Sequence, residues 1–260
     1  MPQGFAELQM YVAPPRVRDA QERWLTRTLE HLAITRLPDP APDLKTLWLS
    51  ADLLLSQTCG YPLMTQLRGR VNVIGRPVYQ LPHSAGGSHC SLLLAREDDP
   101  RHELIDFRGS HGLINSEDSN SGMNLFRHTL APLQVQGRFF GQVSVTGGHR
   151  DSLRGLKQGR GDLAAIDSVT YDYLARDISD EVAGLRIVTQ TALSPCLPYI
   201  TRLGSDGESI RSALNRALHE LPDVASVLAI SEVIPASEDD YQVLLDYQQH
   251  AIDFGYPAIR

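Results

Sequence analysis

The amino-acid sequence predicts an α/β protein. Short apolar runs that suit buried strands alternate along the chain with segments whose apolar residues recur at helical spacing. Strands separated by helices indicate a mainly parallel sheet that is covered on both faces. The chain has 260 residues, of which 42% are hydrophobic and 21% charged, so it can bury the core of one large domain or of two lobes.

The first half begins with a predicted strand at 8–12, where apolar and polar residues alternate before Pro14-Pro15. A helix follows, because Ala20, Trp24, Leu25, Leu29 and Leu32 fall at helical spacing, and the Pro-rich segment 37–42 ends this unit. The later predicted elements are a buried strand in the apolar run 47–55, a helix from Pro62, and strands at 71–79 and 91–95.

The second half repeats this alternation. The predicted strands are 104–107, 143–145, 163–166 and 185–188, and the predicted helices lie around 153–156, from 171 onward, and in the C-terminal part around 210–218 and 241–248. A further helix starts at 125. No internal repeat and no low-complexity tract interrupts the pattern, so the whole chain is expected to fold.

The polar stretch 115–124 precedes the helix that starts at 125. It contains Asp118, Ser119, Asn120, Ser121 and Gly122, which are cap and turn residues. The first amides of a helix have no partner within the helix, and the peptide dipoles place partial positive charge there, so such an end can hold an anion. The serine hydroxyls would add donors, and the glycine would let a ligand approach the backbone. An ordinary capping loop is the alternative, and it is the more common one.

Polar residues stand at three strand-to-helix turns, 57–61, 119–123 and 147–152. In open α/β sheets, ligands bind at the carboxyl ends of strands, where helix N-termini converge. These turns would line one cleft if they face one another, which spacing alone does not decide.

Composition excludes several classes of function. A net charge of −7 argues against nucleic-acid binding, which depends on Lys and Arg. Cys59, Cys90 and Cys196 have unrelated spacings, so neither a disulfide framework nor a CxxC metal site is expected. His83 and His89 lie near Cys90 in a turn-rich segment that fixes no metal geometry. We therefore predict no metal and no cofactor.

Residues 1–10 include Glu7 and have neither a basic start nor an apolar run, so no signal peptide is expected. No stretch is long and apolar enough to span a bilayer, and membrane insertion is not expected. As written, the chain is predicted to be soluble and cytoplasmic. A mature form trimmed of its leader would instead be periplasmic.

Three motifs, in this order, resemble those of the phosphonate, phosphate and phosphite substrate-binding proteins of ABC transporters. They are Gln57-Thr58-Cys59-Gly60-Tyr61-Pro62, then Asn115 with Asp118-Ser119-Asn120-Ser121-Gly122, then Gly148-His149-Arg150-Asp151-Ser152-Leu153 with Gly161-Asp162-Leu163-Ala164-Ala165-Ile166-Asp167-Ser168. The last block is the most specific. With Met10-Tyr11 before the helix of Trp24, the resemblance extends from about residue 8 to about residue 201.

The resemblance implies a type 2 periplasmic-binding-protein fold. Such a fold has two α/β lobes, each a mainly parallel sheet flanked by helices, which are joined by two crossing segments and close on a ligand by hinge motion. By analogy, the crossings lie near 106–110 and 190–195. Lobe one would combine residues 1–107 and 195–260, and lobe two would span residues 108–194.

The resemblance also implies ligand-binding residues. Relatives hold a phosphoryl group at one helix start and with a histidine at the next, which correspond here to Ser119, Asn120, Ser121, Gly122 and His149. Asn120 stands where relatives commonly have Thr, and His89 where they often have Tyr. The predicted set is completed by Tyr11, Gln57, Thr58, Tyr61, His89 and Asp167. The acidic residues that hold an aminoalkyl tail in some relatives are not evident after Pro195.

Alternatives remain for several of these residues. Tyr11 and Tyr61 could be packing residues, and His149 could simply cap its helix. As a hypothesis, the carboxylate of Asp167 or Asp118 accepts a proton from a singly ionised phosphoryl group, which would favour phosphate-like ligands over fully ionised sulfate.

Two classes of function follow. The first is a non-catalytic solute-binding protein that closes two lobes around a small oxyanion of the phosphonate, phosphate or phosphite class and serves an ABC permease. The second is an intracellular enzyme or sensor on the same scaffold, such as a thiamine-pyrimidine-synthase-like protein, with Cys59 as a candidate nucleophile. Ser91 and Ser152 lack the nucleophile-elbow pattern of serine hydrolases. We predict no catalytic residue.

Overall fold

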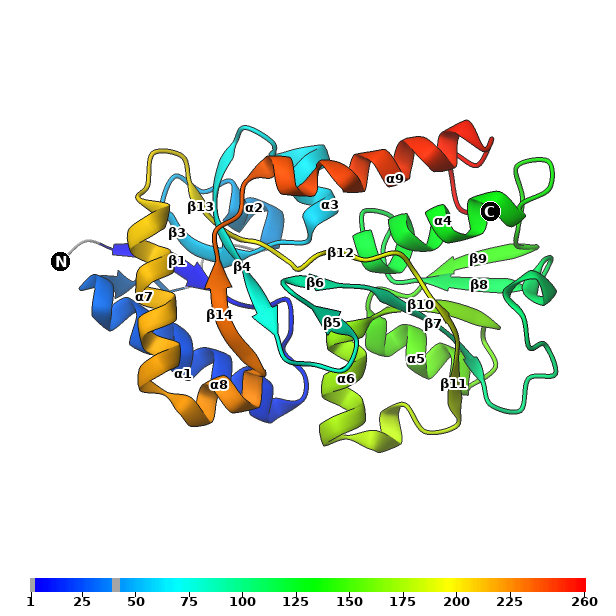
Figure 1. Ribbon diagram of the computed structural model, residues 1–260, viewed down its shortest axis with the longest axis horizontal. Helices are drawn as coiled ribbons and strands as arrows, with labels where there is room; N and C mark the ends of the chain where they lie inside the picture. Colours follow the sequence, from blue (N-terminus) through cyan, green and yellow to red (C-terminus); the bar gives the residue numbers. More distant parts are fainter. Residues whose placement is uncertain (1–2, 39–42) are drawn as a thin grey trace. The chain divides into compact units, whose positions relative to one another are not determined.

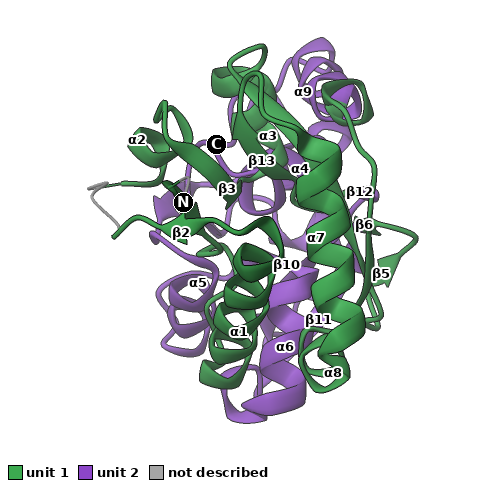
Figure 2. Cartoon of the chain, turned by 90° about the vertical axis from the view of Figure 1, so that its left-hand side faces the viewer, with its two compact units in different colours: residues 1–88, 195–241 green, residues 89–194, 242–260 purple. Residues whose placement is uncertain are grey.

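The computed structural model describes residues 3–38 and 43–260, whose helices and strands are shown in Figure 1. The chain divides into two compact units, which are coloured separately in Figure 2. Unit 1 comprises residues 1–88 and 195–241, and unit 2 comprises residues 89–194 and 242–260. The chain therefore passes from one unit to the other three times.

These divisions differ from the predicted lobes at two places. The first crossing lies between Ser88 and His89, so residues 89–107 belong to unit 2 and not to the first lobe. The second lies directly before Pro195, as in the predicted division. A third crossing, which the sequence did not predict, places residues 242–260 in unit 2.

Unit 1 is built on a six-stranded mixed sheet. Its strands, in spatial order, are β14 (Ile230–Ile234), β4 (Val71–Tyr79), β13 (Tyr199–Arg202), β3 (Leu53–Gln57), β1 (Gln3–Glu7) and β2 (Thr35–Arg36). β1 is parallel to β2 and β3, whereas β13 is antiparallel to β3 and β4, and β14 is antiparallel to β4. The two strands contributed by the later part of the chain thus run against the other four.

The helices of unit 1 are α1 (Pro15–Leu32), α2 (Leu44–Trp48), α3 (Gly60–Pro62), which continues as a π-helical turn over Leu63–Leu67, α7 (Gly207–Glu220) and α8 (Pro222–Leu228). Trp24 on α1 is fully buried, its indole nitrogen donates to the Leu214 carbonyl of α7 at 3.0 Å, and its ring meets Tyr199 edge to face. This contact joins two helices to the sheet, so Trp24 is a core residue as its helical spacing indicates.

Unit 2 has a five-stranded sheet in the order β11 (Leu185–Gln190), β7 (Ser91–Arg96), β10 (Leu163–Asp167), β8 (His111–Ile114) and β9 (Gln142–Val145). β10, β8 and β9 are parallel, and β7 is antiparallel to both β10 and β11. Every residue of β10 is buried. Its continuous apolar run is typical of a central strand that helices cover on both faces.

The helices of unit 2 are α4 (Leu125–Leu130), which follows a π-helical turn over Asn120–Asn124, α5 (His149–Lys157), α6 (Ser168–Asp177) and α9 (Gln242–Asp253). α9 packs on α4, where the Asn124 amide donates to the Leu244 carbonyl at 2.9 Å. The Arg127 guanidinium donates to the Pro257 carbonyl at 2.7 Å. These contacts bury one face of α9 and explain why the C-terminal segment belongs to unit 2.

The predicted strands 8–12 and 104–107 are wrong. The strands found nearby, β1 and β8, each contain a buried glycine. The first strand is β1 and not 8–12. The sequence did not reveal β1 because its inward residues are small, and a Cβ at Gly4 would lie 2.8 Å from the Cβ of Leu54. Residues 104–107 form a 3-10 helix that a Glu103/Asp106 capping box begins. The strand nearby is β8, in which Gly112 packs against the Phe140 ring. Hydrophobic alternation does not mark strands of this kind.

The remaining elements are the short strands β5 (Ser84–Ala85), β6 (Ser88–His89) and β12 (Ser194–Pro195) and the 3-10 helices Ala131–Leu133, Ser179–Glu181 and Glu238–Tyr241. The strands β2, β13 and β14 and the helices α2 and α8 were not predicted. Of the predicted strand 47–55, only its second part is confirmed as β3, because Leu47 lies on α2. The other predicted strands and helices are confirmed. Residues 39–42 of the predicted Pro-rich segment lie outside the described residues.

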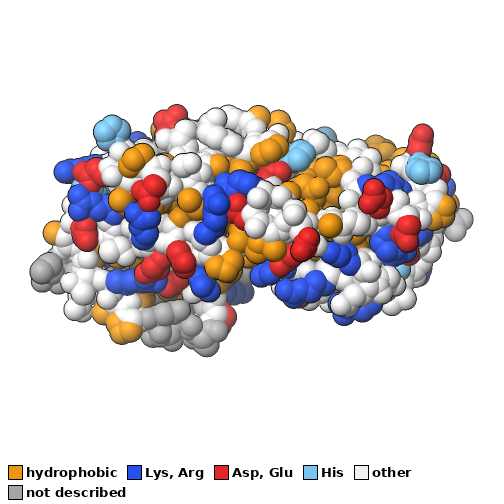
Figure 3. All heavy atoms as spheres, turned by 90° about the horizontal axis from the view of Figure 1, so that it is seen from below, with side chains coloured by type: hydrophobic (Ala, Val, Ile, Leu, Met, Phe, Trp, Pro, Cys, Tyr) orange, Lys and Arg blue, Asp and Glu red, His pale blue; other side chains and the backbone are white. Residues whose placement is uncertain are grey.

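Basic and acidic side chains are interspersed on the face of the molecule that Figure 3 presents. Charged side chains of the protein also pair locally, as Arg27 does with Glu220 at 2.7 Å and Arg36 with Glu22 at 2.5 Å. Such pairing leaves little of the concentrated positive potential that phosphate backbones need. Within residues 3–38 and 43–260, no helix is both long enough and apolar enough to cross a membrane.

Candidate functional site

The helix that runs through 120–130 begins with buried polar side chains. Ser119 is the N-cap, and its hydroxyl oxygen accepts from the Gly122 amide at 3.0 Å. Ser119, Asn120 and Ser121 are only 7%, 2% and 5% exposed. Polar residues at a helix start are usually solvated, so three of them in succession below a tenth exposed form an unusual concentration of buried donors.

Gly122 allows a close approach between this helix start and the end of β8. A Cβ at this position would lie 1.8 Å from the Asn115 side-chain oxygen and 3.2 Å from a ring carbon of His149. Only glycine fits that space, so the residue type is set by packing.

Replacing Gly122 with alanine is therefore expected to destabilise the protein by about 1–3 kcal/mol, the usual cost of overpacking. The measurement is the free energy of unfolding by urea, followed by circular dichroism. Gly148 is the matched control, because its backbone is extended and a Cβ there would come no closer than 3.5 Å to another group. Equal stability of the Gly122→Ala variant and the wild type would contradict this packing argument.

His149 is the first residue of α5, and its Nε2 atom lies 3.1 Å from the Ser121 hydroxyl oxygen. The two predicted motifs therefore meet in unit 2. Burial lowers the pKa of the His149 imidazole, and although the Asp167 carboxylate opposes this shift, the lowering prevails. A neutral imidazole has one donor and one acceptor nitrogen, so it can serve either partner in a hydrogen bond.

Asp167 ends β10 and is the N-cap of α6, where one carboxylate oxygen accepts from the Thr170 amide at 3.0 Å. Its other oxygen lies 3.1 Å from Nδ1 of His89. Burial alone would raise the pKa of the Asp167 carboxyl, but the two nearby imidazoles and the Thr170 amide hold that pKa below its usual value. The carboxylate is thus ionised. Asp118, the other candidate, is exposed and accepts from the Ser116 hydroxyl.

Two serines that the sequence did not single out as ligand-site residues support the cluster. The Ser91 hydroxyl donates to the Ser121 carbonyl at 2.8 Å, and the Asn120 amide donates to the Ser194 hydroxyl at 3.1 Å. Neither serine belongs to a recognisable motif, and the partners are 30 and 74 residues apart. The only available signal is the buried strand that begins at Ser91. The Asn120 side chain, which replaces a common Thr, uses its amide to hold this segment in place.

The remaining predicted site residues lie in unit 1, and all are buried. The Gln57 amide donates to the Leu197 carbonyl at 3.1 Å, and the Thr58 amide nitrogen donates to the Pro198 carbonyl at 3.1 Å. The Tyr11 ring meets Tyr79 edge to face, and the Tyr61 carbonyl accepts from a threonine hydroxyl one turn later. Each residue has a structural contact within its own unit, and a ligand role for these four stays a prediction.

Cysteine chemistry finds little support in unit 2. Burial raises the pKa of the Cys90 thiol to about 11, so this thiol is protonated at neutral pH and is a poor nucleophile. In the described part of the chain, no three His, Cys, Asp or Glu side chains are placed to hold a metal ion.

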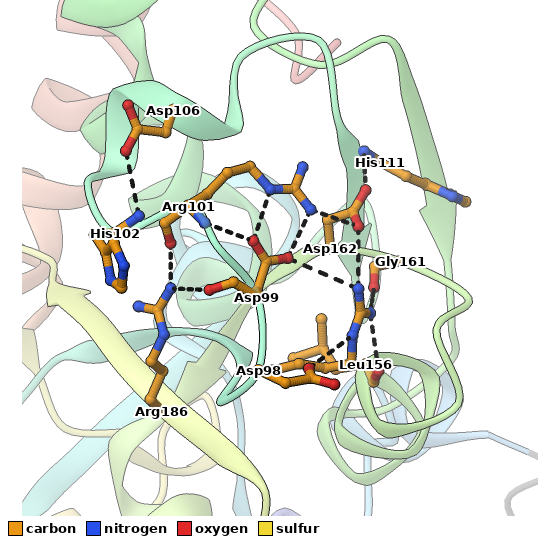
Figure 4. Close-up of polar contacts among 11 residues, drawn as sticks. Asp98, Asp99, Arg101, His102, Asp106, His111, Leu156, Gly161, Asp162 and Arg186 are labelled. Carbon is orange, nitrogen blue, oxygen red and sulfur yellow. Dashed lines mark hydrogen bonds and ion pairs between the residues drawn. The ribbon is translucent and has the colours of Figure 1, made fainter.

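A second group of charged residues in unit 2 is structural (Figure 4). Arg101 binds the Asp99 carboxylate through two nitrogens, at 2.8 and 2.6 Å, and it also donates to Asp162 at 2.8 Å. Arg96 donates to the Leu156 and Gly161 carbonyls at 3.3 and 2.9 Å. Because acid and base are matched here, the group ties loops to the sheet and leaves no charge for a ligand.

Solved structures with a similar fold include binding proteins of transport systems and the sensor domain of a histidine kinase. A binding protein component of an ABC phosphonate transporter from Pseudomonas aeruginosa matches with a TM-score of 0.79 and 16% identity, over 98% of this chain and 88% of that one. PhnD1 from Prochlorococcus marinus, in complex with methylphosphonate, matches at 0.74 and 13%, over 95% and 97%. The periplasmic aliphatic sulphonate binding protein of Escherichia coli matches at 0.59 and 15%, over 95% and 84%. These likenesses confirm the predicted periplasmic-binding-protein fold.

A family model gives the assignment that these low identities do not. Residues 50–241 match the model described as "ABC transporter, phosphonate, periplasmic substrate-binding protein", which covers well over half of the chain. No curated protein matches the sequence. The matched range includes the buried helix start at Ser121 as well as His149. This chain belongs to the family of periplasmic substrate-binding proteins of phosphonate ABC transporters.

Proposed function

We propose that this chain is a non-catalytic solute-binding protein for a small phosphonate-like oxyanion. The observation that carries the proposal is the 3.1 Å approach of the Ser121 hydroxyl to His149, which brings together the starts of two helices within unit 2. The methylphosphonate complex of a structurally similar protein supports the same ligand class.

The chemistry of the cluster suits an oxyanion. The Ser119 oxygen accepts from the Gly122 amide, so its hydroxyl proton remains available to donate to a ligand. Ser121 offers a second hydroxyl, and Nε2 of His149 lies beside it. The two helix starts add partial positive charge. Neutral donors and helix dipoles can hold a small anion without an arginine.

The fold does not distinguish phosphonates from sulphonates, because a sulphonate binding protein also shares it. A singly protonated phosphonate is both donor and acceptor, whereas a sulphonate is an acceptor alone. The neutral His149 imidazole can accept the phosphonate proton, which we propose as one source of preference for phosphorus oxyanions. Asp167 as the acceptor of that proton stays a prediction, to be tested with the Asp167→Asn variant.

Isothermal titration calorimetry tests the proposal with methylphosphonate, phosphate, phosphite, methanesulfonate and sulfate. We expect saturable one-site binding of the phosphorus oxyanions, weaker binding of the sulfur oxyanions, and unchanged ligand in phosphorus NMR after long incubation. Conversion of the ligand would favour the enzyme alternative. The proposal would be overturned if none of the five anions gave a saturable binding heat.

We further propose that the loaded protein delivers its ligand to an ABC permease, as its family membership suggests. The test is the ATPase activity of a phosphonate permease complex reconstituted with this protein. Ligand-dependent stimulation is expected, and a rate that the loaded protein leaves unchanged would argue against this partner.

A further inference from the structure

His89 and Asp167 form a buried pair beside the oxyanion cluster. The two residues are 0% and 2% exposed, and Nδ1 of the imidazole lies 3.1 Å from the carboxylate. Their positions are fixed by the sheet, because Asp167 is paired with Ser91 in the antiparallel ladder of β10 and β7. His89 stands two residues before Ser91, so the ladder brings the imidazole to the end of β10.

The pair is close enough to act on the cluster electrostatically. The Asp167 carboxylate opposes the lowering of the His149 pKa, and His149 in turn helps to keep Asp167 ionised. His149 itself lies 3.1 Å from the Ser121 hydroxyl. A buried carboxylate without a partner at this distance would repel a bound anion, since interactions between charges are poorly screened in the interior. It would also attract any cationic group of the ligand.

We infer that His89 is a specificity-determining residue: by pairing with Asp167 it offsets the carboxylate charge beside the oxyanion cluster, so that the protein prefers phosphonates with uncharged tails to those with an ammonium group. This inference rests on the proposed function. With Nδ1 of His89 facing it at 3.1 Å, the carboxylate has a partner, and it repels a phosphonate and attracts an ammonium group less than an unpartnered carboxylate would.

The second nitrogen of the imidazole gives independent support. Nε2 of His89 is buried, and it has no hydrogen-bond partner among residues 3–38 and 43–260. Buried polar atoms are rarely left unpaired. Nε2 is therefore available for a hydrogen bond with a ligand while Nδ1 faces Asp167.

The test compares two ligands of the same size, propylphosphonate and 2-aminoethylphosphonate, by isothermal titration calorimetry. We expect the wild type to bind propylphosphonate at least about tenfold more tightly than 2-aminoethylphosphonate, which corresponds to a difference in binding free energy of about 1.4 kcal/mol. In His89→Phe the carboxylate loses the imidazole and keeps the Thr170 amide, and the affinity ratio should shift toward 2-aminoethylphosphonate by at least about tenfold. His89→Gln removes the imidazole but can keep one hydrogen bond to the carboxylate, and it should shift the ratio in the same direction.

The double variant His89→Phe with Asp167→Asn separates charge from shape. Removing the carboxylate should restore the preference for propylphosphonate, which a purely structural role of His89 would not allow. Circular dichroism and thermal melting establish that each variant is folded. A folded His89→Gln or His89→Phe protein that keeps the wild-type ratio within about twofold would overturn the inference, as would a wild type that prefers 2-aminoethylphosphonate. A wild type that binds neither phosphonate nor any other oxyanion would instead overturn the proposed function.

Discussion

Replacing His149 with alanine is expected to lower the affinity for methylphosphonate by about 30- to 150-fold, which corresponds to about 2–3 kcal/mol for a hydrogen bond to a charged group. The imidazole lies 3.1 Å from the Ser121 hydroxyl and starts α5. Under the proposed function, its loss removes one partner of the oxyanion and also leaves the serine hydroxyl free to reorient. Calorimetric titration gives the dissociation constant directly.

His111 is the matched control for this prediction. It belongs to the same unit, on β8, and its Nε2 atom lies 2.8 Å from the Ser144 hydroxyl, in a histidine–serine pair of the same kind. His111→Ala should leave the affinity for methylphosphonate unchanged within about twofold, as expected for a side chain remote from the ligand. Equal losses in the two variants would mean that general destabilisation, and not ligand contact, lowers the affinity.

The Asp99→Ala variant is expected to lose about 1–3 kcal/mol of folding free energy, because it removes hydrogen bonds between charged groups while Arg101 keeps Asp162 as a partner. The Asp99 side chain is 1% exposed, and its carboxylate binds Arg101 through two hydrogen bonds. Arg101 also lies over the Phe107 ring, so it cannot simply swing into solvent. Asp98→Ala is the control, because that side chain is 87% exposed, and its removal should change stability by about 0.5 kcal/mol or less.

Urea unfolding of these variants should be followed by circular dichroism. Both tryptophans, Trp24 and Trp48, lie in unit 1, so their fluorescence does not report on unit 2, where Asp99 lies. A loss below about 1 kcal/mol in Asp99→Ala would contradict the structural role given to this group, since that is the ordinary effect of a surface substitution.

Acid should weaken the same group. The Arg101 guanidinium holds the pKa of the Asp99 carboxyl below its ordinary value of 3.8, and burial opposes this shift without reversing it. Because the folded pKa is lower than the unfolded one, the stabilisation is fully present above about pH 4 and is lost as the pH falls through the folded pKa. The wild type should therefore lose more stability than Asp99→Ala over this acidic range. Parallel acid profiles of the two proteins would refute the linkage.

The elements that the sequence predicted correctly are those whose signal is local. The apolar run of β10 and the helical spacing around Trp24 need no distant information. Strands β1 and β8 escaped detection because Gly4 and Gly112 occupy positions where a side chain would collide with a neighbour. The spacing that predicted the last helix could not show its unit, which depends on contact between Asn124 and Leu244, 120 residues apart.

The candidate site divides in the same way. The residues around Ser121 and His149 were found because family motifs mark them, and the structure places the two side chains in contact. The pairing of His89 with Asp167 could not be predicted, since it depends on the register of β7 against β10. The supporting serines, Ser91 and Ser194, act through single hydrogen bonds to distant residues, and neither bond leaves a sequence pattern.

The most direct test of the central claim is an NMR titration of the histidine side chains with methylphosphonate. If the oxyanion binds at the helix starts of unit 2, the imidazole resonances of His149 will shift along a saturable one-site curve while those of His111 stay unchanged. Saturable binding that leaves the His149 resonances unmoved would contradict the account.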